Sequence, residues 1–401
     1  MDLRAVILVG ALITGCSSNP EKVYPPAPVT PGYAVNIEWA NKIAEIGVDR
    51  YSRLLPAVSD SVVIMADTSG QLRYYDKASG EIQWSRQFDT GFSAGPAIYE
   101  DMALLGTQNA EVIALSVKDG NQLWKQTLSS EILSTPQKAK DVVIVQTNDG
   151  KVYGLSAKTG KVSWVYERNV PVLSLRGNST PVIVDDQVVV GFASGKLVSL
   201  AVGDGKLNWE STIAVAKGRT ELERMTDIDG PIVHKSGVLY VSAYHGQVAA
   251  LDAQSGRIIW AREISSQLGV TVGDSLVFVT TVNGRIWALN RESGATLWMQ
   301  DKLEDLANTR PAISGDRLVV GDATGEVYWL SATDGRLLGH LAHNKVSELS
   351  GVTEYVDEIN DEGYFPRKRM ESGVTFRPEA TGNGFLITYQ NGIVALVSAS
   401  N

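Results

Sequence analysis

Short apolar runs separated by polar turns recur along this chain at intervals of about 40 residues. The unit is clearest in residues 136–164, where the apolar run Val142–Val145 is followed by the turn Asn148–Gly150 and a short alternating segment. A second turn at Lys158–Gly160 leads to a last segment that ends in Trp164. Apolar runs this short, bounded by Gly, Asn and Asp, predict β-strands joined by tight turns.

Two markers show that the unit is repeated. A tryptophan lies 14 residues after a turn glycine, or once an alanine, and a proline precedes that turn residue by 14 or 15 residues. The tryptophans at this position are Trp84, Trp124, Trp164, Trp209, Trp260 and Trp298. Proline fits the start of an innermost strand, because it donates no ladder hydrogen bond. Four short antiparallel strands in about 40 residues make one blade of a β-propeller.

The two ends of the chain predict how the ring of blades closes. The last unit, residues 378–400, has three strands and no fourth, while residues 35–39 resemble an outer strand that lacks its blade. We expect residues 35–39 to complete the last blade, because this removes an open sheet edge. The prediction is an all-β, eight-bladed β-propeller of four-stranded antiparallel blades over residues 34–401, in which the seventh outer strand carries Gly339 instead of tryptophan.

The tryptophan series has a packing explanation. Each ring lies on an outer strand, where a large flat side chain fills the wedge between two splayed blades. We therefore expect a structural inter-blade role, and no catalytic one, for Trp39, Trp84, Trp124, Trp164, Trp209, Trp260 and Trp298.

The connections from an outer strand to the next blade vary in length and mark candidate binding loops. From the outer-strand position to the next proline, the connection after Trp84 spans 12 residues, whereas the one after Trp164 spans 17. Those after Trp209 and Gly339 span 22 and 39. In a propeller all such connections lie on one face, and loops on a rigid scaffold usually carry the binding residues.

Five residues in two of these loops are candidates for binding a protein partner. Leu173 and Leu175 alternate with polar residues beside Arg176, and an apolar pair next to a charge fits a protein-binding patch. Asp227 and Asp229 can order a turn, hold Arg176 or meet a partner's cation. The alternative is that the leucines pack under their own loop and the aspartates only cap turns.

The third long loop, residues 341–376, carries many acidic residues and the basic run 367–369. We interpret it as a solvated lobe, with a short helix or an extended hairpin over the mouth of the channel.

The N-terminus predicts secretion and lipidation. Arg4 precedes an apolar run, residues 5–14, that is too short to span a bilayer and is typical of a signal-peptide core. Residues 13–16 (Ile-Thr-Gly-Cys) resemble the lipobox of bacterial lipoproteins. We therefore expect a signal peptide over 1–15, lipidation of Cys16 and a proline-rich tether over 16–33. No aspartate follows Cys16, which favours anchoring in the outer membrane.

Charge and chemistry narrow the function classes. The net charge of −9 argues against a nucleic-acid partner. No catalytic motif occurs in a suitable strand–helix context, so we expect neither an enzyme nor a cofactor. His340 and His343 have ligand-like spacing, but without a helical setting or an acidic neighbour they predict no metal site.

The repeat Leu-Ser-Ala-Lys-Thr-Gly-Lys-Val-Ser-Trp, residues 155–164, resembles that of the quinoprotein (pyrroloquinoline quinone) dehydrogenases. That family implies an eight-bladed propeller and is the alternative interpretation, a periplasmic quinoprotein enzyme. Its cofactor site uses adjacent cysteines, and Cys16 is the only cysteine here.

The same repeat, combined with a lipobox and this length, resembles the BamB family, lipoproteins of the outer-membrane β-barrel assembly (BAM) machinery. The most specific part is Leu173-Ser-Leu175-Arg176-Gly with Asp227-Ile-Asp229. The resemblance implies that these residues bind the POTRA domains of BamA at the periplasmic face of the outer membrane. It also implies support for folding and insertion of β-barrel proteins. A further alternative is that outer-strand edges pair with nascent β-strands.

Overall fold

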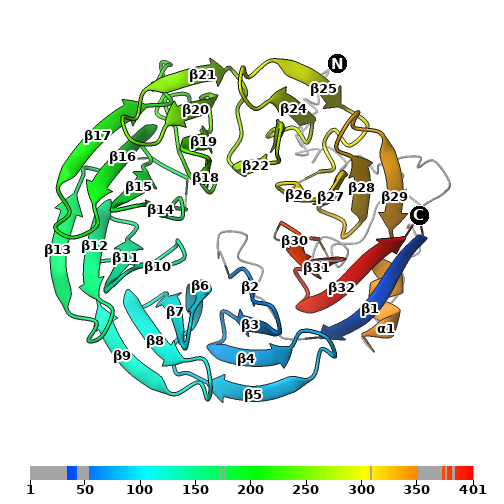
Figure 1. Cartoon of the computed structure of the whole chain (residues 1–401), viewed down its shortest axis with the longest axis horizontal. Coiled ribbons are helices and arrows are strands. Elements are labelled where there is room, and N and C mark those ends of the chain that lie inside the picture. Colours follow the sequence, from blue (N-terminus) through cyan, green and yellow to red (C-terminus); the bar gives the residue numbers. More distant parts are fainter. Residues whose placement is uncertain are drawn as a thin grey trace, which may run out of the picture.

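The computed structural model describes residues 34–42, 54–171, 173–175, 177–307, 309–350, 373–374, 377–381 and 384–400. Eight four-stranded antiparallel sheets stand around a ring, as Figure 1 shows. The predicted fold class is confirmed. Within the described residues no helix is long and apolar enough to cross a membrane.

The strands of the first four blades follow one another in the chain, from the innermost strand outward. The first two blades consist of β2 (Ala57–Val58), β3 (Val62–Ala66), β4 (Gln71–Asp76) and β5 (Ile82–Gln87), and of β6 (Phe92–Tyr99), β7 (Met102–Thr107), β8 (Glu111–Ser116) and β9 (Gln122–Thr127). The next two consist of β10 (Gln137–Ala139), β11 (Val142–Gln146), β12 (Lys151–Ser156) and β13 (Val162–Glu167), and of β14 (Val182–Val184), β15 (Gln187–Gly191), β16 (Lys196–Ala201) and β17 (Leu207–Thr212).

The remaining blades repeat this order, except that the last one combines both ends of the chain. The fifth and sixth consist of β18 (Val233–Lys235), β19 (Val238–Ser242), β20 (Val248–Asp252) and β21 (Ile258–Arg262), and of β22 (Val270–Val272), β23 (Leu276–Thr280), β24 (Ile286–Asn290) and β25 (Thr296–Gln300). The last two consist of β26 (Ala312–Ser314), β27 (Arg317–Gly321), β28 (Val327–Ser331) and β29 (Leu337–Leu341), and of β30 (Glu379–Thr381), β31 (Gly384–Thr388), β32 (Ile393–Ser400) and β1 (Ala34–Lys42).

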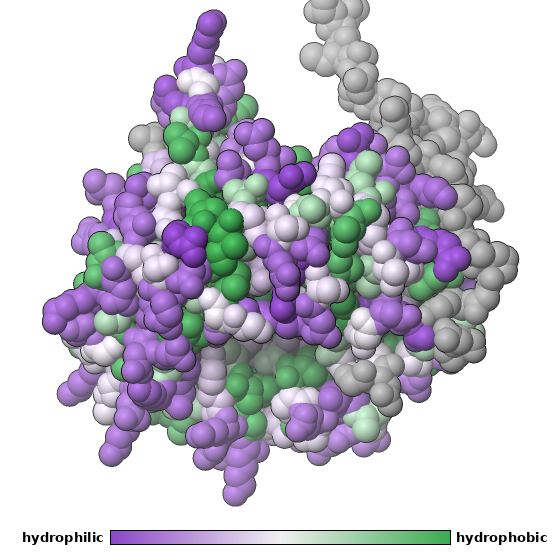
Figure 2. All heavy atoms as spheres, turned by 45° about the horizontal axis from the view of Figure 1, so that its top comes forward, coloured by the Kyte–Doolittle hydropathy of each residue, from purple (hydrophilic) through white to green (hydrophobic). Residues whose placement is uncertain are grey.

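The core lies between the blades, in the two middle strands of each sheet. In β11, residues 143–146 are all buried, because both faces of a middle strand pack against neighbouring blades. The outer strand β13 is mostly exposed. Each fully buried Val or Leu stabilises the fold by about 1.5–3 kcal/mol, so the middle strands supply most of the apolar stabilisation. The surface in Figure 2 is mainly hydrophilic, with apolar patches between.

The ring closes through β1, as the ends of the chain predict. β1 pairs antiparallel with β32 from Ala34 opposite Ser400 to Lys42 opposite Ile393. The strand is longer than the predicted residues 35–39, and a bulge lies between Ile37 and Trp39. Pairing with β1 covers the edge of β32 that would otherwise be open.

Proline begins the innermost strand in the expected way at most blades, but Pro96 lies inside β6. The pairing of β6 with β7 shifts between Ala94 and Ala97, so Pro96 falls in an irregularity where no ladder hydrogen bond is required of it.

Each tryptophan of the series contacts the next blade at a fixed place. Trp124 donates a hydrogen bond of 2.7 Å from Nε1 to the carbonyl oxygen of Ala157. A Cβ placed on Gly160 would lie 2.5 Å from the same ring, and Gly160 has a φ of +72°. Equivalent indole hydrogen bonds join Trp39 to Lys77, Trp84 to Val117, Trp164 to Val202, Trp260 to Arg291 and Trp298 to Ala332.

The seam between the seventh and eighth blades has a different construction. The tryptophans contact the turn between the third and fourth strands of the next blade, but in the closing blade these are β32 and β1, from opposite chain ends. Gly339 therefore has no such turn to meet. The helix α1 (His343–Leu349) lies beside β1 and β32 on the outside of the ring, and its Val346 is buried with Ala40 and Leu341. Residues 341–376 were expected to place a short helix or a hairpin over the mouth of the channel. The helix α1 lies on the outside of the ring instead, and residues 351–372 lie outside the described part.

Candidate functional site

The two long loops on the fourth-blade side of the ring are tied together by a hydrogen bond. The first connects β13 to β14 and the second connects β17 to β18. The backbone amide of Leu175 in the first loop donates to Oδ2 of Asp227 in the second, at 2.8 Å. Asp227 is 1% exposed, and its own carbonyl oxygen accepts from the amide of Tyr244 in the fifth blade. A buried carboxylate thus joins loops from adjacent blades.

Leu173 is presented to solvent on the first loop. It is 41% exposed, whereas Leu175, two residues later, is half-buried. The loop is also fixed before Leu173, because a Cβ placed on Gly150 would lie 2.6 Å from Cγ2 of Val170. Val170 therefore packs directly on the turn between β11 and β12. Leu173 sits between two attachment points, and this limits the entropy that it would lose on binding.

The second loop enters the core around Asp227 and Asp229. Both side chains are buried, and so is Ile228 between them. A Cβ placed on Gly191 would lie 2.5 Å from Cγ2 of Ile228, so this side chain fills the space that the glycine leaves on the fourth blade. The aspartates are therefore placed to order the loops rather than to lie on the outer surface. Arg176 lies outside the described residues.

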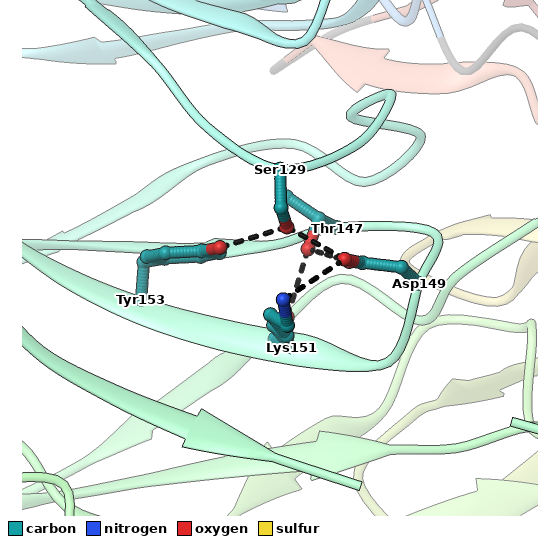
Figure 3. Close-up of polar contacts among 5 residues, drawn as sticks. All are labelled: Ser129, Thr147, Asp149, Lys151 and Tyr153. Carbon is teal, nitrogen blue, oxygen red and sulfur yellow. Dashed lines mark hydrogen bonds and ion pairs between the residues drawn. The ribbon is translucent and has the colours of Figure 1, made fainter. Parts of the chain in front are cut away.

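A polar cluster beneath the first loop, shown in Figure 3, fixes the turn on which Val170 rests. Tyr153 donates to Oγ of Ser129 at 2.7 Å, and Ser129 donates to Asp149 at 2.6 Å. Thr147 also donates to Asp149, and Lys151 lies 3.4 Å away. Burial raises the pKa of Asp149, but the hydroxyl hydrogen bonds and Lys151 outweigh it and hold that pKa below its usual range.

The same cluster contains a serine hydroxyl and a carboxylate, groups that also occur together in the active sites of hydrolases. Ser129 is exposed, but its hydroxyl donates to a carboxylate whose pKa is lowered and which is therefore a weak base. The oxygens of Asp149 already accept from two hydroxyls. The arrangement joins the second and third blades and orders a turn.

The two histidines with ligand-like spacing, His340 and His343, lie in different elements and contact different residues. His340 lies in β29, contacts the carboxylate of Glu326 and stacks on Tyr328, whereas His343 begins α1 and packs against Tyr389. The expectation of no helical setting and no acidic neighbour is wrong on both points. Over the described ranges there is no group of three or more His, Cys, Asp or Glu that could hold a metal ion.

One feature of the second loop was not predicted. Val215 and Leu222 are strongly exposed, and Thr220 with Glu223 forms a capped turn beside them. The signal was present in the sequence, because Thr-x-x-Glu is the capping-box pattern. Without a helical run after it, the pattern could not be separated from an ordinary polar loop.

Comparisons with known proteins agree with the fold. A family model described as outer membrane protein assembly factor BamB matches residues 68–300 and 246–360. The BamB protein of Pseudomonas aeruginosa is 39% identical over 338 residues, which cover 84% of this chain and 89% of that protein.

The similarity to solved structures differs between the two families that the repeat resembles. The crystal structure of BamB from Moraxella catarrhalis superposes with a TM-score of 0.78 at 25% identity, covering 91% of this chain and all of that one. Quinohemoprotein alcohol dehydrogenase from Comamonas testosteroni has a TM-score of 0.65 at 13% identity, covering 90% of this chain and 76% of that one, and it shares the fold alone. The chain belongs to the family of the outer membrane protein assembly factor BamB.

Proposed function

We propose that this chain is a non-enzymatic scaffold lipoprotein of the BAM complex, which binds the POTRA domains of BamA and assists folding and insertion of outer-membrane β-barrel proteins. The relatives are named as outer membrane protein assembly factors. The observation that carries the proposal is Leu173, an exposed apolar side chain on a loop that is attached to the fold on both sides.

The mechanism is binding. Leu173 buries its exposed apolar surface in the partner, and Arg176 beside it sets the orientation by charge. Asp227 and Asp229 act from within the fold, because a buried carboxylate that holds the Leu175 amide keeps the loop in its binding shape. Pre-ordering of this kind increases affinity without adding a contact.

The lipid anchor places this surface in the periplasm. Cleavage after residue 15 leaves Cys16 as the lipidated N-terminus, and residues 16–33 act as a tether to the outer membrane. More than one acyl chain is needed for stable anchoring, and a lipoprotein cysteine supplies them. In support of a non-enzymatic role, the polar cluster around Asp149 is fully engaged in ordering a turn.

Co-purification from detergent-solubilised membranes tests the proposal. The full-length double variant Leu173→Ala, Arg176→Ala should retain BamA about fivefold less well than the wild type, since a truncated interface anchor costs about 1 kcal/mol or more. Leu297→Ala is the matched control, because Leu297 is 56% exposed on the distant strand β25. Wild-type recovery of BamA by the double variant would rule out this interface. Cys16→Ser should release the protein from the membrane fraction.

A further inference from the structure

The loop between β17 and β18 carries a second exposed apolar feature, separate from Leu173. Val215 is 61% exposed and Leu222 is 63% exposed, which places them among the most exposed large apolar side chains of the described chain. Residues 215–224 are all exposed, whereas residues 225–230 are all buried. The apolar side chains therefore stand on a segment that projects from the fold, and the buried residues 225–230 root this segment in the core.

The backbone that presents Leu222 is ordered by its own hydrogen bonds. Glu223 accepts from the amides of Arg219 at 2.6 Å and Thr220 at 3.2 Å, and the hydroxyl of Thr220 accepts from the amide of Glu223 at 3.2 Å. The amide of Arg224 donates to the carbonyl oxygen of Thr220, which closes one helical turn. We call residues 219–224 the capped turn. A reciprocal capping box satisfies amides that would otherwise require water.

The capped turn is fixed to the body at its far end. Met225 is buried, and its amide donates to the carbonyl oxygen of Leu222 at 3.3 Å. Gly218, with a φ of +137°, precedes the turn, and any Cβ there would collide with Glu223. Leu222 is therefore held outward by a tight backbone that is anchored in the core. A rigid exposed leucine loses little conformational freedom on binding.

The charges of residues 215–224 indicate which kind of partner surface the segment would bind. Glu221 is paired with Arg224, and Glu223 is occupied by the backbone amides of the turn. Lys217 and Arg219 form no ion pair with any residue that the structure describes. On a chain whose net charge is −9, this leaves two cations in the same exposed segment as Leu222. The complementary surface is an apolar pocket with acidic groups at its rim.

We propose that the capped turn is a second docking element, in which Leu222 enters an acidic-rimmed apolar pocket of the protein that also contacts Leu173. This inference rests on the proposed function, since the partner is BamA. The hydrogen bond from Leu175 to Asp227 joins the first loop to the buried root of the second, so Leu173 and the capped turn belong to loops that are held together. A lipid surface fits less well, because the segment has a small apolar area and carries Glu221 and Glu223 as well as its cations.

Affinity measurements with detergent-solubilised, full-length BamA test the inference. Leu222→Asp should weaken binding of the full-length protein at least about tenfold, because a charge would replace the inserted side chain. The double variant Lys217→Glu, Arg219→Glu should also weaken binding, and its affinity should rise with salt where that of the wild type falls. Leu297→Asp, at a similarly exposed leucine on β25, should stay within about twofold of the wild type.

The outcomes separate the two proposals. Unchanged affinity of Leu222→Asp, with the Leu173 variant still impaired, would overturn the second docking element and leave the proposed function standing. Failure of the wild type to bind BamA would overturn both. Loss of binding to phosphatidylglycerol vesicles by Leu222→Asp, with its affinity for BamA unchanged, would assign the capped turn to the membrane and would also overturn the inference. The charge variant keeps the test decisive if Leu222→Asp folds poorly.

Discussion

Trp124 donates a 2.7 Å hydrogen bond to the carbonyl oxygen of Ala157, one blade further along the ring. The same indole covers Gly160, whose φ of +72° lets the turn pass beneath the ring. The contact joins two sheets that share no backbone ladder at that point. Because it recurs from blade to blade, we expect it to contribute to the cooperativity of the ring, with Trp209 as the informative exception.

Replacement of Trp124 by Phe removes the indole N–H donor. The buried carbonyl oxygen of Ala157 is then left without this hydrogen bond. We expect a loss of about 1–3 kcal/mol in the free energy of unfolding, the usual cost of an unsatisfied buried group, with a smaller addition for the lost ring area. Gly160→Ala should cost at least about 1–2 kcal/mol, since a Cβ is disfavoured at a positive φ and would meet the indole. Urea denaturation followed by fluorescence measures both.

Trp209 provides the matched control for this prediction. It packs on Gly256 in the same way, but its Nε1 has no hydrogen-bond partner among the residues that the structure describes. Trp209→Phe should therefore cost less than Trp124→Phe by about 1–3 kcal/mol, because it leaves no carbonyl unsatisfied. Equal costs for the two variants would show that the ring area, and not the hydrogen bond, carries the contact.

The repeat spacing made the fold predictable. In the first six blades the tryptophan of the outer strand follows a turn glycine or alanine by 14 residues, so this period in the sequence reports the period of the blades in space. The pairing of residues 34–42 with β32 followed from counting strands at the ends. A short helix or an extended hairpin was expected somewhere in residues 341–376, but the bounds and position of α1 could not be derived, because seven residues show no clear helical period.

The candidate site was predictable only in part. That Leu175 and Asp227 come close follows from adjacent long loops on one face, but their hydrogen bond could not be derived from spacing. The burial of Asp227 and Asp229 contradicts the general tendency of carboxylates to remain exposed. The carboxylate of Asp227 is held by the backbone amide of Leu175 from a distant segment, and a single sequence does not display such a partner.

Asp227→Ala should make the first loop more mobile without changing any side chain on the exposed surface of that loop. The Leu175 amide loses a charged acceptor, and such hydrogen bonds contribute about 1.5–3 kcal/mol. We expect faster hydrogen exchange in residues 173–175 and weaker binding of BamA, with the ring otherwise intact. Glu292→Ala, an exposed carboxylate in the turn between β24 and β25 of the sixth blade, serves as control. If exchange in residues 173–175 matched the wild type, the positioning role of Asp227 would have to be abandoned.

Asp322 should make the stability of the ring depend on pH. Burial raises the pKa of Asp322 to about 6, above the usual 3.8, and outweighs the hydrogen bonds from Thr324 and the Glu326 amide, while the Glu326 carboxylate raises it further. A raised carboxyl pKa means that the folded state binds the proton more tightly than the unfolded state. Stability from this group therefore increases as pH falls from above 6 towards 4, by about 2–3 kcal/mol at full extent.

Asp322→Asn isolates this effect, because the amide keeps an oxygen that can accept the same hydrogen bonds but cannot ionise. At pH 7.5 the variant should be more stable than the wild type, and the difference should shrink at pH 5, where the wild-type carboxyl is mostly protonated. Asp67→Asn makes the same change in the equivalent turn of the first blade and controls for the effect of the amide on the turn itself. Urea midpoints at the two pH values measure the difference. A constant difference between Asp322→Asn and wild type at pH 5 and 7.5 would contradict the raised pKa.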